Sequence, residues 1–189
     1  RDLPWRRTRD PYRVFVSEVM LQQTQISRVL PKYREWFRLF PDWRALSRAS
    51  FPSVLRAWQG LGYNLRARYL KDAAEIIVRD FAGKIPSSPR ILETFLGVGH
   101  YTARAVFCFA LGRCEPFIET NIRRAIIHEF FPSNEKDVTD GKILMILARI
   151  EPHKRKKDWY LALMDYGADL KGRFPNPNQR GKSYVRQSR

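Results

Sequence analysis

Residues 96–103 read Leu-Gly-Val-Gly-His-Tyr-Thr-Ala, in which two glycines flank one valine. Apolar residues recur at helical spacing both before and after this stretch. Because the chain must reverse between the two segments within about four residues, we expect Gly97 and Gly99 to adopt positive φ or to lie in close backbone contact. The stretch therefore predicts two helices joined by a glycine-rich hairpin.

Such a hairpin can bind a phosphate. The second helix begins with free backbone N–H groups, which attract an anion together with the helix dipole, and glycine leaves room for it. A plain helix–loop–helix connection with a glycine C-cap is the simpler alternative, and the stretch taken alone favours it. The choice depends on the rest of the chain.

The charge of the chain favours a polyanionic partner. Lys and Arg number 35 against 19 Asp and Glu, which gives a net charge of +16 and a pI near 10.4. Nucleic acid is the expected partner. No uninterrupted apolar run approaches the ~20 residues that span a bilayer, and residues 1–5 lack the apolar core of a signal peptide. We expect a soluble, intracellular, DNA-associated protein.

The cysteines and histidines indicate no metal site. Cys108 and Cys114 are the two cysteines, which fits a reducing compartment, and we expect Cys108 to be a buried thiol rather than half of a disulfide. His100, His128 and His153 are too scattered to bind a metal together. We expect no cofactor.

Helical periodicity extends through nearly all of the 189 residues, and no strand alternation competes with it. An apolar content of 44% is enough for a substantial core, so we expect an all-α, orthogonally packed fold. Residues 172–189 are predicted to form an irregular basic tail. The expected helices are residues 12–23, 26–40, 42–49, 52–58, 64–81, 89–95, 101–111, 120–131, 142–150 and 159–171.

Several segments, in order along almost the whole chain, together resemble one family. They are residues 3–6 (LPWR), 10–12 (DPY), 17–25 (SEVMLQQTQ), 60–63 (GLGY), 97–99 (GVG) and 164–168 (MDYGA). The chain is similar in these segments to MutY-type adenine DNA glycosylases, which belong to the endonuclease III-like helix–hairpin–helix glycosylase superfamily. Residues 17–25 are far more specific to the family than the hairpin.

The resemblance implies a two-lobed helical fold and a substrate of double-stranded DNA with a mismatched or damaged base. A six-helix barrel lobe would comprise residues 11–113, and residues 1–10 and 114–189 would form the second lobe. The target base would be flipped out of the duplex, since the glycosidic bond is inaccessible in the stack. We expect the protein to act as a monomer.

The resemblance also implies which residues contact DNA. Gln23 matches the residue that wedges into the gap left by the flipped base, and Trp5 and Arg6 match the edge of the base pocket. For Tyr63, core packing is an equal alternative, although the preceding glycine-rich turn favours exposure. The remaining matches are Thr24 and Leu61, which with Tyr63 would touch the opposite base, and Gly97, Val98, Gly99 and His100, which would hold a phosphate.

Glu18 is the expected general acid. It lies on a helix with many apolar residues, and such surroundings raise the pKa of a carboxyl group and keep it protonated near neutrality. In the family, the matching Glu protonates the departing purine and helps activate water. The positive charge that develops on the sugar calls for a second carboxylate.

The second carboxylate departs from the family pattern. The family has an Asp about twenty residues after the hairpin, and here Glu119 takes this position, followed by Asn121, which would help to hold the site or a phosphate. The extra methylene moves the carboxylate by about 1 Å or more, a shift to which catalysis is sensitive. Glu119 either does the same work, which we favour, or serves a pocket remodelled for another base, or lowers activity.

Two further positions bear on the chemistry. Tyr101 stands where related bifunctional glycosylases carry a Lys that forms a Schiff base, so the resemblance implies a monofunctional hydrolase. Many members hold a [4Fe–4S] cluster with four cysteines, but the matching positions are Lys171, Asn178, Gly181 and Gln187, so we expect no cluster. Residues 174–184 would instead pack through Phe, Pro and Tyr side chains.

The sequence thus predicts a DNA glycosylase of base excision repair, with mispaired adenine as the first candidate substrate. We expect no C-terminal domain of the kind with which adenine glycosylases inspect 8-oxoguanine. Together with Glu119, this expectation leaves thymine, uracil or another altered base as the alternative substrate. A noncatalytic DNA-binding module is the alternative from a different class.

Overall fold

The computed structural model describes residues 2–132 and 134–182, which divide after Leu111 into two units. Every helix predicted from the sequence is present, and the described residues contain no strand, only an isolated bridge between Val138 and Gly181. The all-α prediction is confirmed. No helix among these residues has the length and apolar character required to cross a membrane.

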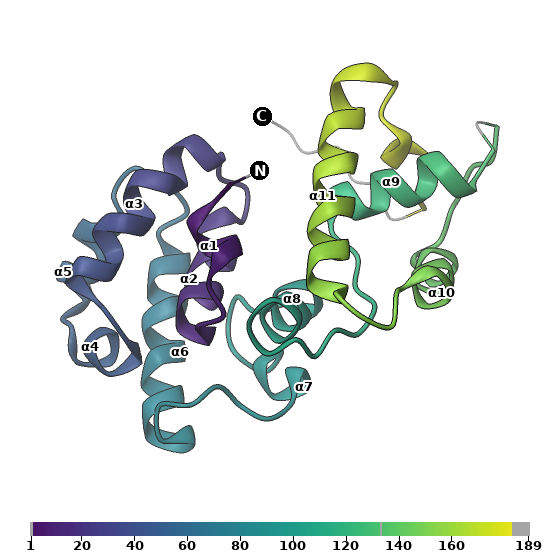
Figure 1. The fold of residues 1–189 in the computed structure, drawn as a ribbon. Helices are drawn as coiled ribbons and strands as arrows, with labels where there is room; N and C mark the ends of the chain where they lie inside the picture. The colour runs from purple at the N-terminus through teal and green to yellow at the C-terminus, as the bar shows by residue number, and fades with distance from the viewer. Residues whose placement is uncertain (1, 133, 183–189) are drawn as a thin grey trace. The chain divides into compact units, whose positions relative to one another are not determined.

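The first unit contains eight helices, shown in purple to teal in Figure 1. Several begin at a capping residue close before a proline: the Asp10 carboxylate accepts from the N–H groups of Tyr12 and Arg13, and Ser50 and Ser88 cap their helices in the same way. The helices are α1 (Pro4–Arg7), α2 (Pro11–Leu21), α3 (Ile26–Leu39), α4 (Trp43–Arg48), α5 (Phe51–Trp58), α6 (Leu65–Phe81), α7 (Pro89–Leu92) and α8 (His100–Leu111).

Helix α2 lies at the centre of this unit and packs against α3, α6 and α8. It is covered on nearly all sides, and Val14, Phe15 and Met20 are completely buried. Three tryptophans, Trp36, Trp43 and Trp58, are buried in the same core. Any polar side chain on α2 therefore has to be accommodated inside the unit.

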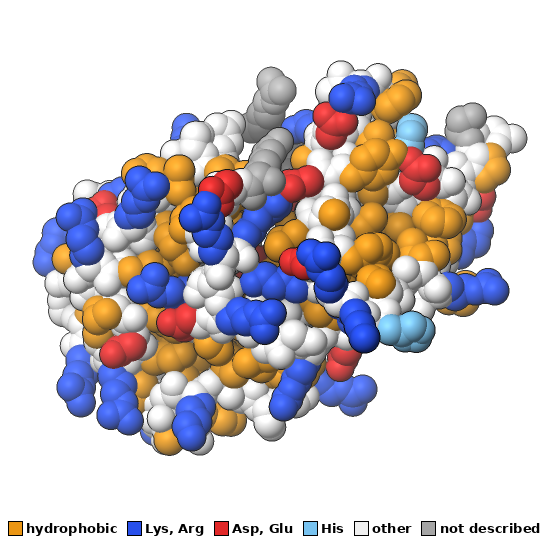
Figure 2. All heavy atoms as spheres, in the orientation of Figure 1, with side chains coloured by type: hydrophobic (Ala, Val, Ile, Leu, Met, Phe, Trp, Pro, Cys, Tyr) orange, Lys and Arg blue, Asp and Glu red, His pale blue; other side chains and the backbone are white. Residues whose placement is uncertain are grey.

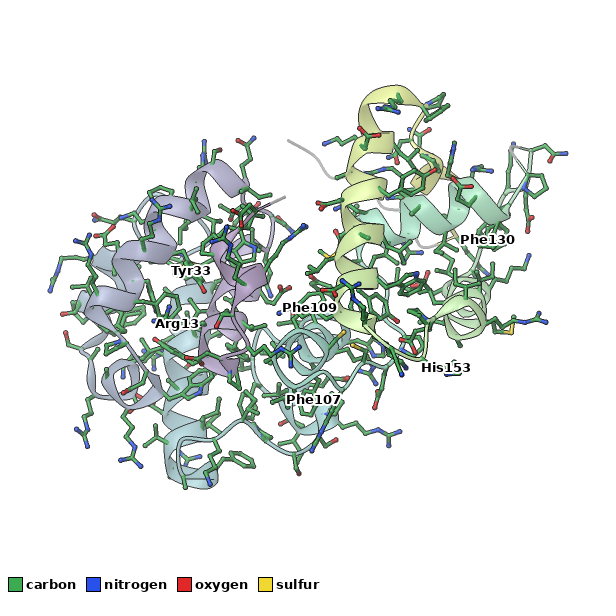
Figure 3. The ribbon with its side chains drawn as sticks, in the orientation of Figure 1. Arg13, Tyr33, Phe107, Phe109, Phe130 and His153 are labelled. Atoms are coloured by element: carbon green, nitrogen blue, oxygen red, sulfur yellow. The ribbon has the colours of Figure 1, made fainter. Side chains whose placement is uncertain are left out.

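Residues 2–10 lie in this unit, although the resemblance groups residues 1–10 with the C-terminal segments. The reason is apolar packing: Trp5 on α1 is buried and meets Tyr33 of α3 edge-on, with ring centroids 5.3 Å apart. Figure 3 labels Tyr33 together with Arg13, whose guanidinium lies over the ring of Phe37.

The second unit contains α9 (Thr120–Phe130), α10 (Asp140–Ile150), α11 (Lys156–Arg173) and the 3-10 helix η1 (Pro177–Arg180). Helices α9 and α11 cross very closely at Gly167. A Cβ atom at Gly167 would lie 1.9 Å from the Asn121 carbonyl oxygen, so only glycine fits. His153, labelled in Figure 3, lies in the loop before α11.

The C-terminal segment differs from the predicted irregular tail. Residues 177–180 form η1, which is held to α9 by hydrogen bonds from polar side chains: Asn178 Nδ2 donates to the Thr120 carbonyl (3.0 Å), and Arg180 donates to the carbonyls of Ile127, Phe131 and Pro132. The expected packing through Phe, Pro and Tyr side chains is confirmed for Pro177, which is buried, whereas Phe174 is 47% exposed and contacts the ring of His128 with one face. Tyr184 and Gln187 lie outside the described residues.

Three other expectations change. The predicted helix 89–95 ends as α7 at Leu92, and α11 begins at Lys156, three residues before the predicted start of the helix 159–171. Cys108 and Cys114 are both disulfide-bonded, so the free thiol expected at Cys108 is wrong. Gly112, which directly follows α8 with a φ of 69°, lies between the two cysteines and ends the helix in the left-handed conformation that glycine favours.

Candidate functional site

Glu18 and Tyr101 lie together in the first unit. Glu18 is 5% exposed on α2, and Tyr101 is in the first turn of α8, the helix that follows the hairpin. The Tyr101 hydroxyl donates a hydrogen bond to Glu18 Oε2 at 2.6 Å. A buried carboxyl group is thus oriented by a phenol, an arrangement suited to delivering a proton to a bound substrate.

The hairpin contains one glycine whose conformation and surroundings both exclude a side chain. Gly97 has φ of 76°, and a Cβ there would lie 2.6 Å from Cδ2 of Tyr69. Gly99 has neither a positive φ nor an atom within 4 Å of the position that a Cβ would take, so the expectation of a positive φ or a close contact holds for Gly97 alone. The reversal is complete by Gly99, whose carbonyl already accepts the first helical bond of α8, from the Ala103 N–H at 3.1 Å.

Of the other two hairpin residues, Val98 faces the core and His100 faces solvent. Val98 is buried and anchors the hairpin, whereas His100 is exposed at the start of α8, with Nδ1 3.7 Å from a Glu93 carboxylate oxygen. Glu93 also receives a hydrogen bond from Arg104. The open space at Gly99 next to an exposed His100 fits the approach of an anion to the N-terminus of α8.

The residues expected to face the opposite base lie on two loops, which we call the wedge loop (residues 22–24) and the recognition turn (residues 60–63). Gln23 is exposed with φ of 54°, and Tyr63 is 66% exposed with φ of 48°. The exposure of Tyr63 excludes core packing, the alternative that the sequence left open. Positive φ at residues other than glycine costs about 1–3 kcal/mol and persists where the surroundings impose it.

Leu61 and Thr24 are placed differently from Tyr63. Leu61 is only 3% exposed, so its side chain belongs to the core, and contact between this side chain and a base is not supported. The Leu61 carbonyl and the Gln22 carbonyl both lie within hydrogen-bond distance of the Thr24 hydroxyl, at 3.4 and 3.2 Å. Thr24 thus joins the wedge loop to the recognition turn.

Sequence reasoning missed Arg66 and Gln22. Arg66, at the start of α6, is buried and donates to acceptors on both loops. Gln22 Nε2 donates to the Gly97 carbonyl and to the Thr102 hydroxyl, at 3.2 and 3.3 Å, which links the wedge loop to the hairpin. The sequence carried no signal for Arg66, because an arginine near a helix start is usually a solvated residue.

Trp5 and Arg6 lie on α1. Trp5 is 6% exposed and forms part of the core, while Arg6 is partly exposed. Trp5 can therefore support a base pocket only as a buried residue behind its surface, whereas the side chain of Arg6 has access to solvent.

Glu119 and Asn121 lie in the second unit, where Glu119 is the N-cap of α9. Its carboxylate accepts from the Asn121 and Ile122 N–H groups, at 2.8 and 3.4 Å, and from Asn121 Nδ2 at 3.1 Å. Arg124 donates to Asn121 Oδ1 and to the Gly167 carbonyl, at 2.7 and 2.6 Å. Burial raises the pKa of Glu119, and these N–H groups and Arg124 lower it in part. Asn121 thus holds the Glu119 carboxylate through its backbone N–H and its side-chain amide.

No group of three or more His, Cys, Asp or Glu side chains within residues 2–132 and 134–182 could hold a metal ion. Figure 2 shows Lys and Arg side chains spread over the visible face of each unit rather than gathered in one patch.

The family model and the most similar curated proteins agree on the family of this chain. The model described as "HhH-GPD superfamily base excision DNA repair protein" matches residues 16–159. An adenine DNA glycosylase of Mycobacterium tuberculosis is 40% identical over 178 residues, which cover 90% of this chain and 57% of that enzyme. A thymine/uracil-DNA glycosylase of Methanothermobacter thermautotrophicus is 31% identical, with 89% of this chain and 77% of that enzyme covered.

Solved structures agree on the fold. A thermostable thymine-DNA glycosylase matches with a TM-score of 0.80 and 27% identity over 97% of this chain and 86% of that one. A noncovalent endonuclease III–DNA complex matches with a TM-score of 0.63 and 19% identity, covering 87% of this chain and 74% of that one, a likeness of fold alone. The chain spans little more than half the length of the mycobacterial adenine glycosylase.

Proposed function

The chain belongs to the HhH-GPD superfamily of base excision DNA repair proteins, and on this premise we propose that it is a monofunctional DNA glycosylase. It flips a mispaired base, adenine in the first instance, out of double-stranded DNA and hydrolyses its N-glycosidic bond. The observation that carries this proposal is the hydrogen bond between Tyr101 and the buried Glu18.

The chemistry follows from a buried acid. Glu18 donates a proton to a ring nitrogen of the flipped base, and the electron pair of the C1′–N bond leaves with the base. The sugar acquires oxocarbenium character and is attacked at C1′ by water, whose proton passes to a carboxylate. Glu119, in the second unit, is proposed to supply the second carboxylate on the basis of its match to the family Asp.

Tyr101 supports hydrolysis without strand cleavage. A Schiff base requires an amine nucleophile, and the phenol of Tyr101 occupies the position that a Lys takes in bifunctional relatives. Hydrolysis leaves an abasic site and an intact phosphodiester backbone. We propose that the protein does this as a monomer.

The DNA contacts are assigned from exposure and charge. The hairpin with Gly99 and His100 binds a backbone phosphate, and the Lys and Arg side chains seen in Figure 2 add salt-sensitive attraction. Gln23 enters the gap in the duplex, while Tyr63 contacts the opposite base. Both side chains are exposed in the first unit.

Removal of thymine or uracil is the second candidate. Glu119 replaces the Asp of the adenine-specific pattern, and the structural match to a thymine-DNA glycosylase covers 97% of the chain. Because Tyr at position 101 occurs in both branches, it does not separate them.

The test uses duplexes with a single A·G, A·8-oxoguanine, T·G or U·G pair, each treated with alkali after incubation. Alkali-dependent cleavage at A supports the adenine assignment, and cleavage at T or U supports the second candidate. Binding without any cleavage would identify a noncatalytic DNA-binding module. Glu18→Gln must abolish excision, whereas Glu75→Gln, on the exposed face of α6, must retain it.

A further inference from the structure

Arg66 is buried between the wedge loop and the recognition turn, with 7% of its surface exposed. Its Nη1 donates to three carbonyl oxygens at the end of α2 and beyond it: those of Val19 at 2.9 Å, Met20 at 3.1 Å and Gln22 at 2.6 Å. A cation is favourable there, because the last carbonyls of a helix lack helical partners and carry partial negative charge.

The second terminal nitrogen of Arg66 faces the other loop. Nη2 donates to the Leu61 carbonyl at 3.0 Å, to the Gly62 carbonyl at 3.1 Å and to the Thr24 hydroxyl at 3.0 Å. The planar guanidinium also lies 5.2 Å from the ring centroid of Trp58 and 5.5 Å from that of Tyr63. One rigid group therefore connects the two loops.

These loops carry the strained residues of the site. Gln23 and Tyr63 both have positive φ, and each adjoins a residue whose carbonyl accepts from Arg66. Turning the carbonyls of Gln22 and Gly62 inward, toward Arg66, holds the next residue in its unusual conformation and directs the exposed side chains outward. Trp58 Nε1 fixes the recognition turn from the other side by donating to the Gly62 carbonyl at 2.9 Å.

The same connection reaches the hairpin. Gln22 gives its carbonyl to Arg66 and uses its side-chain amide to bind the Gly97 carbonyl and the Thr102 hydroxyl. The phosphate-binding hairpin, the wedge loop and the recognition turn are thus held in one hydrogen-bonded unit before DNA arrives. Preorganisation of this kind improves discrimination, because the correct partner does not have to order the loops.

We propose that Arg66 is a positioning residue that fixes Gln23 and Tyr63 relative to the hairpin and thereby sets how the protein discriminates the base opposite the flipped nucleotide. The proposal rests on the proposed function for the identity of the reaction. The unstacking of the opposite base on DNA binding, which the proposal also predicts, can be measured without any excision.

The variant that tests the proposal is Arg66→Lys. An ammonium group keeps the charge but cannot reach six acceptors distributed around a plane on two loops. Arg68→Lys is the matched control, since Arg68 lies in the same helix, is exposed and pairs with Asp72. Trp58→Phe is the second variant, which loosens the recognition turn by removing the bond to the Gly62 carbonyl while keeping an aromatic ring.

The first measurement is fluorescence of 2-aminopurine placed opposite a tetrahydrofuran abasic analogue. The unchanged protein should raise the fluorescence at saturation, because the exposed side chains unstack the opposite base. Arg66→Lys should give a clearly smaller rise at saturation, with Trp58→Phe shifted in the same direction and Arg68→Lys unchanged. If the unchanged protein gives no rise, or Arg66→Lys gives the full rise, the proposal is overturned.

The second measurement is the ratio of single-turnover excision rates for the target base opposite its preferred and a non-preferred partner. We expect Arg66→Lys to lower this ratio roughly tenfold, the effect of about one charge-assisted hydrogen bond. A purely structural defect would reduce the fraction of active protein equally for every duplex and would leave the ratio of the two excision rates unchanged. An unchanged ratio for Arg66→Lys would therefore contradict the proposal. If Arg66→Lys does not fold by circular dichroism, Trp58→Phe decides by the same criteria.

Failure of the proposed function gives a different result. In that case the unchanged protein excises no base from any of the duplexes. The fluorescence experiment still reports whether Arg66 controls the unstacking of the opposite base.

Discussion

The hydroxyl of Tyr101 lies 2.6 Å from Glu18 Oε2, across 83 positions of sequence, and joins the first turn of α8 to the last turn of α2. The bond places the first residues after the hairpin and the buried carboxyl group in one rigid arrangement. If the hairpin binds a phosphate as we propose, this bond positions that phosphate relative to Glu18, the proposed proton donor. Catalysis depends on such positioning to within fractions of an ångström.

Tyr101→Phe tests this bond. The variant keeps the ring and removes the hydroxyl donor, so the protein should fold and bind DNA normally. A hydrogen bond to the neutral, protonated carboxyl group that acts as the acid contributes about 0.5–1.5 kcal/mol, so the single-turnover rate should fall roughly 2- to 10-fold. An unchanged rate in rapid-quench experiments would show that Tyr101 does not orient Glu18.

Tyr101→Lys tests the reaction type. The unchanged protein should give no covalent DNA adduct with sodium borohydride, since a phenol does not form a Schiff base. Placing an amine beside Glu18 should produce a borohydride-trapped complex on electrophoresis. Trapping of the unchanged protein would rule out the monofunctional assignment, and Tyr101→Phe provides the control without an amine.

Gly97→Ala and Gly99→Ala should separate folding from phosphate binding. At Gly97 a Cβ would collide with Tyr69 at a positive φ, so we expect destabilisation of about 1–3 kcal/mol in urea unfolding. At Gly99 the Cβ meets no protein atom within 4 Å, so stability should stay close to that of the unchanged protein while DNA affinity falls. Equal DNA affinity for Gly99→Ala and the unchanged protein would show that no phosphate approaches this position.

Glu119→Gln should change the pH dependence of stability. Because burial raises the pKa of Glu119, its contribution is fully present below the ordinary glutamate pKa of about 4.3 and is lost as the pH rises through the folded pKa. Glutamine keeps an oxygen acceptor for the N–H groups of α9 and does not titrate. The stability of Glu119→Gln relative to the unchanged protein should therefore increase with pH over this window.

Urea unfolding at several pH values between acid and neutral measures this difference. Glu115→Gln, at an exposed glutamate nearby in the sequence, is the control for replacing a carboxylate by an amide. A stability difference for Glu119→Gln that is constant with pH would contradict a raised pKa. Excision by Glu119→Gln should be lost even where its stability is higher, since the amide supplies no carboxylate.

Gly167→Ala tests the crossing of α9 and α11. The added methyl group would overlap the Asn121 backbone, which forces the N-terminus of α9 to move, at a cost of about 1–3 kcal/mol. Gly172→Ala is the matched control in the same helix: no atom lies within 4 Å, and alanine favours a helix by about 1 kcal/mol. Equal denaturation midpoints for the two variants would show that the crossing is looser than described.

The sequence by itself determined the helices and the candidate residues of the site. Apolar periodicity depends on local spacing, so it located the helices, and the glycine-rich hairpin with residues 17–25 indicated the family. Glu18 and Tyr101 could be selected because their residue types suit proton donation and exclude an amine nucleophile. These properties are carried by individual residues and short segments.

Only the tertiary structure decided which side chains meet. The bond from Tyr101 to Glu18, the six bonds of Arg66 and the contact of Gly167 with Asn121 connect residues that no local pattern relates. The burial of Leu61 and the exposure of Tyr63 also depend on packing, since both residues belong to the same turn. Short-range spacing specifies a helix, whereas the partner of a buried polar group is selected by the chain segments that fold around it.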